Sequence, residues 1–313
     1  MIPAPALALA LAVSTALLAC GGEVVTLGKS SANGSAGGAG TAGADGTKFA
    51  PATLVAELAS AGDDSDNPTL TADLLEIYFT SNRKGGAGDV DVWSARRNST
   101  DEPFSAPKPV SAVNTDQFET SPAVSFDGLE LYIGSKRDGG LGEQDIWVSG
   151  RATRDDDWTA LQNVTALNSP DKDIPRPPAM AGRVMPLGSR RTGLDYYETF
   201  LAERASVGEP FGEPRKLSEL EVAGKNTVDG FLTEDGLLIY FNLSPGSGES
   251  TGDLFVAKRP SLDAPFGEPA PLTSVNTSHD ERDPWLSPDR KLLFFSSDRD
   301  GKLNIYVASS LEH

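Results

Sequence analysis

The sequence predicts an all-β fold, a five-bladed β-propeller whose blades are four-stranded antiparallel sheets. Two observations lead to this prediction. The 313 residues include 32 glycines and 22 prolines, a composition that favours many turns between short strands. One phrase, written "SPAVSFDGLELYIGSKRDGGLGEQDIWVSGR" from Ser121, also occurs in five versions along the chain. Several short strands in each of about five such units are the sequence signature of a propeller.

The repeat has a period of 54 residues, which is visible in three columns. The first column consists of Pro68, Pro122, Arg176, Gly230 and Pro284. The second, five residues later, consists of Asp73, Asp127, Ala181, Asp235 and Asp289. The third, ten residues further on, consists of Arg83, Arg137, Arg191, Pro245 and Arg299. A period that survives in three columns predicts five copies of one structural unit.

Each unit contains the signals of about four strands. Apolar runs such as "LEIYF" at Leu75 and "LELYI" at Leu129 are bounded by turns, and Asp127-Gly128 is a hairpin signal. The next strand begins two places before an aromatic residue, at Asp91, Asp145, Glu198, Asp253 and Asn304. A Phe-x-x-Pro phrase then predicts a last strand at the outer edge, where proline is tolerated.

The chain also contains a segment that can close the ring. The fifth unit lacks its own Phe-x-x-Pro strand, whereas "FAPATLVAEL" from Phe49 stands ahead of the first unit. We expect this segment to pair with the last blade, because closure removes exposed sheet edges. The propeller is therefore expected over residues 48–313.

The region before the repeats predicts a lipoprotein. An apolar run from Ala6 to Leu18 leads into "LLAC", which ends at Cys20 and resembles the lipobox of bacterial lipoproteins. That resemblance implies a signal peptide over residues 1–19 and lipidation of Cys20, the single cysteine. The alternative is an ordinary secretory signal with an incidental cysteine. Residues 20–47, rich in Gly, Ala and Ser, are expected to form a flexible tether.

The repeat resembles that of a known family. The second unit carries the pattern in full, as Pro122, Ser125, Asp127, Gly128, Leu131, Tyr132, Ser135, Arg137, Gly142, Asp145, Ile146 and Trp147. This pattern is similar to the PD40, or WD40-like, repeat of TolB-type and other bacterial envelope proteins. The resemblance covers about residues 49–313 and implies an envelope propeller that binds or scaffolds. Together with Cys20 it implies a lipid-anchored protein at the outer membrane or the periplasmic side.

The third unit departs most from the repeat. It loses the Asp-Gly turn, and Pro186 in "VMPLGS" makes its second strand doubtful as a blade member. Because irregular blades often carry a site, the candidate contacts with a partner in this unit are Arg190, Arg191, Tyr196 and Tyr197.

Five carboxylates stand just before the innermost strands and are candidate channel-mouth binding residues. They are Asp66, Glu119, Asp173, Asp229 and Asp283. In the strand order of the family they would surround one mouth of the channel, and their negative potential would suit a cation, a basic peptide or a sugar. The alternative is that they cap turns and are separately solvated. The arginines of Ser-x-Arg and the aspartates of "DIW" recur in most units, so we expect them to be structural.

The charge and the residue inventory restrict the function. With 45 acidic and 27 basic side chains the net charge is -18, which opposes nucleic acid and leaves membrane contact to the anchor. With two histidines and one cysteine, the chain has almost no residues that could form a zinc site or a Ser-His-Asp triad. We therefore expect no cofactor, no metal and no catalytic residue, in a monomeric scaffold that binds an envelope protein or a glycan.

The alternative function is a glycoside hydrolase, and whether the protein is an enzyme stays open at this point. Such an enzyme needs two carboxyl groups about 5 to 10 Å apart with separated pKa values. Asp66, Glu119, Asp173 and Asp229 could take these roles. Against this, most of the four stand at matching points of the repeat, whereas a catalytic cavity should be marked by residues that break it.

Overall fold

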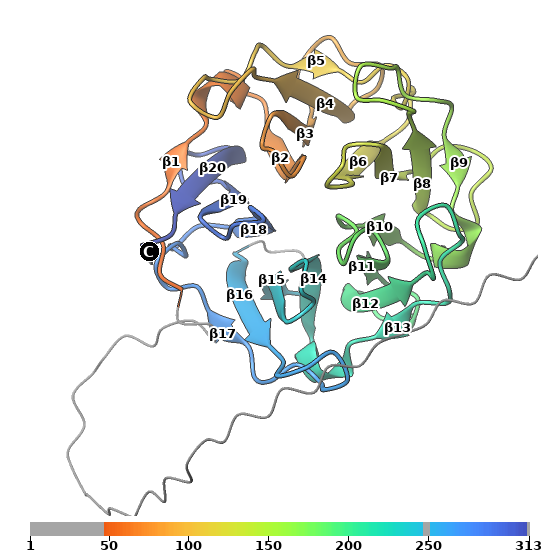
Figure 1. The fold of residues 1–313 in the computed structure, drawn as a ribbon, viewed down its shortest axis with the longest axis vertical. Coiled ribbons are helices and arrows are strands. Elements are labelled where there is room, and N and C mark those ends of the chain that lie inside the picture. Colours follow the sequence, from red (N-terminus) through yellow and green to blue (C-terminus); the bar gives the residue numbers. More distant parts are fainter. Residues whose placement is uncertain (1–46, 247–250, 312–313) are drawn as a thin grey trace, which may run out of the picture. The chain divides into compact units, whose positions relative to one another are not determined.

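The computed structural model describes residues 47–246 and 251–311, which form a ring of five four-stranded sheets (Figure 1). The predicted all-β, five-bladed propeller is confirmed. The predicted signal peptide, the lipidation site Cys20 and the tether lie outside the described residues, except for residue 47. Within the described part of the chain, no helix has the length and apolarity needed to span a membrane.

In the first four blades the strands run in chain order from the centre of the ring to its rim. The first blade consists of β2 (Ser65–Leu70), β3 (Glu76–Ser81), β4 (Asp91–Arg96) and β5 (Lys108–Pro109). The second consists of β6 (Glu119–Val124), β7 (Glu130–Ser135), β8 (Asp145–Gly150) and β9 (Gln162–Asn163). The third consists of β10 (Asp173–Pro175), β11 (Val184–Ser189), β12 (Glu198–Glu203) and β13 (Arg215–Lys216).

The fourth blade consists of β14 (Lys225–Leu232), β15 (Leu238–Pro245), β16 (Asp253–Lys258) and β17 (Ala270–Pro271). The fifth consists of β18 (Glu281–Leu286), β19 (Leu292–Ser297), β20 (Asn304–Ser309) and, at its outer edge, β1 (Thr53–Leu54). Short 3-10 turns follow three of the outer strands, at η1 (Ala56–Leu58), η2 (Thr165–Leu167) and η3 (Ser218–Leu220). The third strand of every blade begins at the predicted acidic or Asn column.

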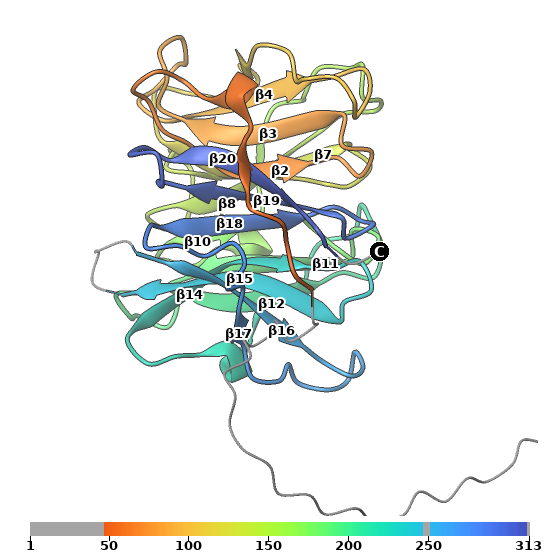
Figure 2. The same cartoon turned by 90° about the vertical axis from the view of Figure 1, so that its left-hand side faces the viewer.

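The N-terminal segment closes the ring as predicted. Thr53 pairs with Val307 and Leu54 with Tyr306, in antiparallel register. Figure 1 shows β1 on the outer side of β20, and Figure 2 faces this side of the ring. Phe49 is buried at 2% exposure, as the aromatic residues of the Phe-x-x-Pro phrases are. The last blade is therefore completed by a strand that precedes the first blade in the sequence.

The Phe-x-x-Pro phrase fixes the outer strands by packing as well as by its proline. Its aromatic ring lies beneath a guanidinium from the end of the preceding strand, with 4.4 Å from Arg97 to the ring centre of Phe104 and 4.7 Å from Arg259 to that of Phe266. The same arginines donate from Nε to backbone carbonyl groups of a neighbouring turn. Recurrence of this contact explains why the phrase returns in the sequence.

The expectation that Pro186 disqualifies its strand is wrong. β11 is six residues long, buried throughout, and paired with both β10 and β12. Pro186 lacks an N–H, but its carbonyl accepts a bond from the backbone N–H of Arg176 at 3.0 Å, just past the end of β10. The irregularity of the third blade lies instead in β10, which has only three residues.

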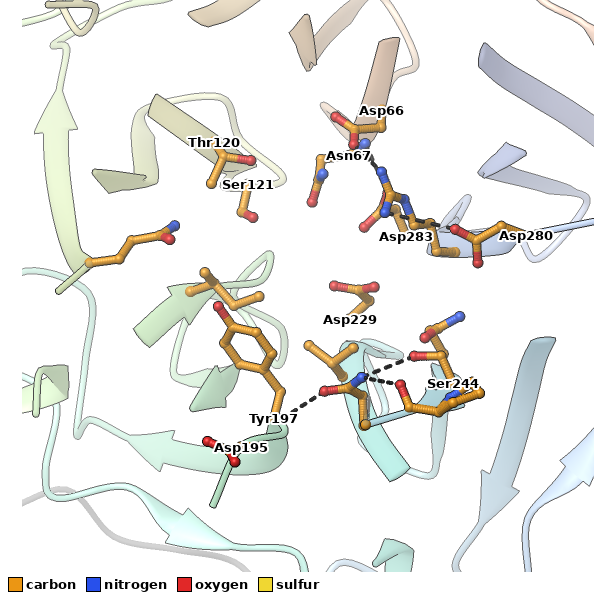
Figure 3. Close-up of a pocket in the computed structure, with 18 of the residues that line it drawn as sticks. Asp66, Asn67, Thr120, Ser121, Asp195, Tyr197, Asp229, Ser244, Asp280 and Asp283 are labelled. Atoms are coloured by element: carbon orange, nitrogen blue, oxygen red, sulfur yellow. Dashed lines mark hydrogen bonds and ion pairs between the residues drawn. The ribbon is translucent and has the colours of Figure 1, made fainter. Parts of the chain in front are cut away.

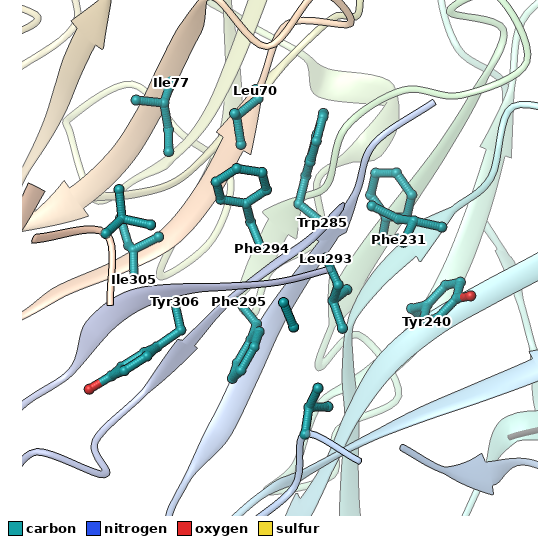
Figure 4. Packing of buried hydrophobic residues seen from close by; sticks show 14 of the residues in the cluster. Leu70, Ile77, Phe231, Tyr240, Trp285, Leu293, Phe294, Phe295, Ile305 and Tyr306 are labelled. Carbon is teal, nitrogen blue, oxygen red and sulfur yellow. The ribbon is translucent and has the colours of Figure 1, made fainter. Parts of the chain in front are cut away.

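The aromatic core joins inner strands of different blades (Figure 4). Trp285 of β18 lies 5.9 Å from Phe231 of β14 and 6.1 Å from Phe126, as measured between ring centres. Trp285 and Phe231 stand toward the ends of their strands, whereas polar residues such as Asp66 and Arg282 stand at the beginnings of theirs. The inner strands thus carry an apolar cluster at one end and polar side chains at the other.

Candidate functional site

A cavity of about 470 Å³ opens where the inner strands begin. All five inner strands contribute to its wall, through Asp66, Asn67, Thr120, Ser121, Ile174, Val228, Asp229, Arg282 and Asp283. Figure 3 shows the labelled side chains of these strands around one common space. The volume falls within the range of about 300 to 1,000 Å³ that is usual for small-molecule sites.

The backbone turns four of these side chains into the cavity at one repeated position. Asn67, Ser121, Asp229 and Asp283 have φ angles of 54°, 50°, 62° and 57°. Each lies within a break in strand register, which is the mark of a β-bulge. Left-handed conformations cost non-glycine residues about 1 to 3 kcal/mol and cluster at functional sites.

The third blade breaks this pattern because proline cannot adopt a positive φ. Pro175 occupies the bulge position there, and the register of β10 with β11 is regular. The next residue, Arg176, replaces the proline or glycine found at this point in the other units. Its Nη1 donates to Oδ1 of Asn67 at 2.9 Å, and its Nη atoms lie 3.5 Å from carboxylate oxygens of Asp229 and of Asp283. One buried guanidinium therefore joins four blades.

A second arginine, Arg282, contacts three carboxylates. Its Nη2 lies 2.6 Å from Oδ2 of Asp66, and its other nitrogens lie 3.8 Å from Asp280 and 3.6 Å from Asp283. These carboxylates raise the pKa of the guanidinium above its ordinary value, although burial acts in the opposite direction. Arg282 is therefore charged at any physiological pH.

Two carboxyl groups of the cavity titrate near neutrality. Burial raises the pKa of Asp66 to about 6, against the lowering effect of Arg282. Burial also raises the pKa of Asp229 to about 7, with a further contribution from the charge of Asp283, and Arg176 opposes both effects. Both groups can hold or release a proton close to neutral pH.

The fourth blade builds one wall of the cavity. β14 and β15 each have eight residues, whereas the corresponding strands of the first, second and fifth blades have six. Asn226 at the start of β14 accepts a bond from the backbone N–H of Tyr197 at 2.8 Å and donates to the carbonyl of Pro245 at 3.0 Å. The longer hairpin thus fixes the turn that brings Tyr197 to the cavity.

The structure brings together three of the five predicted channel-mouth residues. Asp66, Asp229 and Asp283 line the cavity, but Glu119 and Asp173 do not. Both of the latter are fully buried. They precede Thr120 and Ile174 by one residue and so point to the opposite face of the strand, because side chains alternate along a strand.

Glu119 and Asp173 instead each belong to a buried clip, which is the set of hydrogen bonds that an acidic side chain accepts from the Ser and the Arg of a Ser-x-Arg motif. Glu119 accepts bonds from Oγ of Ser135 at 2.9 Å and from Nη2 of Arg137 at 3.2 Å. Asp173 accepts in the same way from Ser189 and Arg191. The expected structural role of the Ser-x-Arg arginines is therefore confirmed. The five carboxylates occupy three columns of the repeat rather than one: Glu119 and Asp173 share a column, Asp229 and Asp283 share a second, and Asp66 stands alone in the third.

The four third-blade candidates have different surroundings. Tyr197 lines the cavity, and burial raises the pKa of its phenol to about 12. Arg190 pairs with Asp195 at 3.2 Å, and Arg191 is held in the clip. Tyr196 is half-buried outside the cavity lining. Of this set, only Tyr197 reaches the candidate site.

Sequence reasoning missed Arg176, Arg282 and Gln144, which all lie at the site. Arg176 stands in the proline column, and Arg282 stands in the column of Asp66, Thr120, Ile174 and Val228. Departure from the repeat was the signal that could have found the two arginines. Among the described residues, no group of three or more His, Cys, Asp or Glu is arranged to hold a metal ion.

No family model matches the chain, and no curated protein matches it. Solved structures share its fold. They include α-L-arabinofuranosidase from Lactobacillus brevis (TM-score 0.57, 10% identity, 82% of this chain and 92% of that chain) and endo-arabinase from Bacteroides thetaiotaomicron (0.53, 15%, 84% and 97%). TolB from Acinetobacter baumannii matches with a TM-score of 0.51 and 18% identity over 80% of this chain. The likeness is one of fold. The matched region spans 56% of that TolB chain.

Proposed function

We propose that the protein is a binding module of the bacterial cell envelope and that its ligand enters the channel cavity. One observation carries this proposal: the cavity of about 470 Å³ is lined by polar side chains at positions where the repeat breaks. Repeated residues build the blades, whereas Asp66, Arg282 and Tyr197 have no matching residue in the other blades. Five identical units would line the cavity with the same residues five times. Residues that differ between the units therefore suit a ligand that lacks five-fold symmetry.

The envelope location rests on the sequence around Cys20 and on the PD40-like pattern. A lipobox-like segment followed by a Gly, Ala and Ser-rich tether suits a propeller that is held at a membrane by lipid and contacts it in no other way. The fold likeness to TolB supports the same assignment. The protein would act there as a monomer toward an envelope protein or a glycan.

Lipidation is tested by substitution of Cys20. Full-length protein and its Cys20→Ser variant would be expressed in a Gram-negative host with a clickable palmitate analogue. We expect the wild type to carry the label and to sediment with membranes, and the variant to lose both properties. Unlabelled wild-type protein in the soluble envelope fraction would contradict the anchor and leave a secreted propeller.

The binding site is tested by hydrogen exchange on the full chain. Peptide and glycan fractions of bacterial envelopes serve as probes. Binding should protect the backbone amides at the starts of β14 and β18 and the turn around Tyr197, which surround the cavity. Protection confined to the outer strands would place the ligand on the rim and contradict the proposal.

A glycoside hydrolase is the second candidate, and one observation favours it. The raised pKa values of Asp66 and Asp229, about 6 and about 7, suit a general acid. Arg282 and Arg176 contact these carboxylates, however, which suits fixed binding groups. Turnover of arabinan or of aryl glycosides by the full chain, abolished by Asp66→Ala or Asp229→Ala, would replace binding by catalysis as the function.

A further inference from the structure

Unpaired hydrogen-bond donors gather around the channel cavity. Nine buried side-chain nitrogen or oxygen atoms of the described residues have no hydrogen-bond partner, and three of them are N–H donors of Gln144, Arg176 and Arg282. Nε2 of Gln144 and Nε of Arg282 belong to residues that line the cavity, although Nε of Arg282 also lies 3.6 Å from a carboxylate oxygen of Asp283. Nε of Arg176 belongs to the guanidinium that contacts Asp229 and Asp283. A buried donor without a partner costs about 1 to 3 kcal/mol. Such groups in a folded protein call for an explanation, and a bound ligand that accepts their hydrogen bonds is one.

Gln144 is the clearest case of the three, because a glycine, Gly134, stands next to its side-chain amide. The residue is 4% exposed and lines the cavity. A Cβ atom added at Gly134 would lie 2.7 Å from Nε2 of Gln144, which is closer than a carbon can approach. Any side chain at residue 134 would therefore displace the amide. The glycine leaves this space to the amide, and the observation that points to a ligand is the buried amide nitrogen without a hydrogen-bond partner.

The same cavity is rich in acceptors. Asp66, Asp229 and Asp283 present carboxylates, and Asp195 and Asp280 lie in the same wall. Against these five acidic side chains stand Arg282 and the adjoining Arg176. An anionic ligand would satisfy the unpaired donors but would face a net negative wall. A simple cation would satisfy the carboxylates but would leave the donors unpaired.

A ligand whose polar atoms both donate and accept fits both sets. A hydroxyl group has one O–H donor and two acceptor lone pairs, so it can bridge a carboxylate and an N–H donor. A peptide N–H only donates and a peptide carbonyl only accepts. The wall also has apolar patches from Phe118, Ile174 and Val228 and the ring of Tyr197, against which the C–H face of a sugar can lie.

We propose that the ligand of this cavity is a neutral saccharide, whose hydroxyl groups pair the amide of Gln144 and the guanidinium of Arg282 with the carboxylates of Asp66 and Asp229. This proposal rests on the proposed binding function and names its ligand class. It holds whether the saccharide is only bound or is also cleaved.

The test uses the full chain in a detergent without a sugar headgroup and measures affinity by calorimetry. The neutral probes are arabinobiose, cellobiose and N,N′-diacetylchitobiose. Putrescine represents cations, glucuronate represents anions, and an N-acetylated tri-alanine amide represents peptides. We expect at least one neutral disaccharide to bind more tightly than the other three classes.

Two variants locate the contact. Gln144→Met removes an unpaired amide and nearly keeps its shape, so it should fold at least as stably and yet weaken disaccharide binding about tenfold. Asp66→Asn should weaken binding by a similar factor. Thr69→Val is the matched control, because Oγ1 of Thr69 is also buried and unpaired but lies outside the cavity lining. It should leave the affinity unchanged.

The other outcomes separate this proposal from the binding function on which it rests. Binding of putrescine that depends on Asp66 but not on Gln144 would overturn the saccharide and keep the cavity as a binding site. Binding of glucuronate or of the capped peptide in place of the disaccharides would do the same. Disaccharide binding that none of the variants affects would place the site elsewhere and overturn both.

Discussion

Arg176 donates a hydrogen bond from Nη1 to Oδ1 of Asn67, 2.9 Å away, and so links the third blade to the first. The same guanidinium contacts Asp229 of the fourth blade and Asp283 of the fifth. The contact depends on Pro175, which prevents the bulge found at this point in the other four blades. The irregular blade thus supplies the guanidinium that contacts two carboxylates of the cavity wall.

Loss of this guanidinium should destabilise the ring. Arg176→Met leaves buried carboxylates without their partner, and breaking a buried ion pair in this way typically costs about 3 to 5 kcal/mol. Arg290→Met is the matched control, since Arg290 pairs with Asp235 at 2.6 Å where both side chains are more than 40% exposed. It should cost less than about 1 kcal/mol. Urea unfolding of both variants checks the difference, and equal losses would contradict a buried organising role.

The raised pKa of Asp229 predicts a pH dependence of stability. In the folded state the carboxyl titrates at about 7, against 3.8 for an ordinary Asp. Between these values the folded state keeps a proton that the unfolded state has lost, so the free energy of unfolding falls as pH rises. The slope is at most about 1.4 kcal/mol per pH unit for one group.

Asp229→Asn removes this titration and leaves the rest of the chain unchanged. The free energy of unfolding of the wild type, minus that of the variant, should therefore decline from about pH 4 to pH 7 and level off above it. Urea unfolding at four or five pH values measures this difference. A difference that rises over the same interval would mean that the folded state favours the charged form.

The ion pair between Arg137 and Glu119 predicts that substitutions of these two residues have non-additive effects on the free energy of unfolding. Arg137→Met should strongly destabilise the protein, because Glu119 keeps a buried charge without its partner. Glu119→Thr in addition should recover part of the loss. The fourth blade lacks the acid, the serine and the arginine together, with Thr227, Leu243 and Pro245 in their places. A double variant as unstable as the sum of both single variants would show that the two side chains act independently.

Ring closure predicts a large effect of one aromatic residue far from the site. Phe49→Ala removes a ring that is 2% exposed, and such truncations cost about 3 to 5 kcal/mol. Leu54→Ala in β1 is the control, since Leu54 is 37% exposed and surface changes usually stay within about 0.5 kcal/mol. Similar unfolding midpoints for the two variants would mean that the closing segment adds little stability.

The fold was predictable from the sequence because the residue pattern that specifies one blade occurs five times. Every strand boundary occurs in several copies, so a proline such as Pro186 could mislead in one unit without changing the architecture. The closing strand was predictable for the same reason, since the fifth unit lacks the outer strand that the other units have, and an apolar segment beginning at Phe49 stands ahead of the first unit. Period and strand count were sufficient for these features.

The site was only partly predictable because it depends on local backbone geometry. A shift of one residue separates Glu119, buried in a clip, from Thr120, which lines the cavity. The positive φ angles that turn Asn67 and Asp229 inward leave no mark in composition. The partners of Arg176 lie on three other blades and are far from it in the sequence, so residue spacing does not predict these contacts.

The central claim is that the end of the channel is the binding site, and filling it tests this claim most directly. Thr120→Trp would place an indole in the cavity, whereas Thr100→Trp would place one on an exposed turn between β4 and β5. The measurement is the affinity of each folded full-length variant for the best-bound disaccharide. We predict a loss of at least about tenfold for Thr120→Trp and no change for Thr100→Trp. Wild-type affinity in Thr120→Trp would contradict the account.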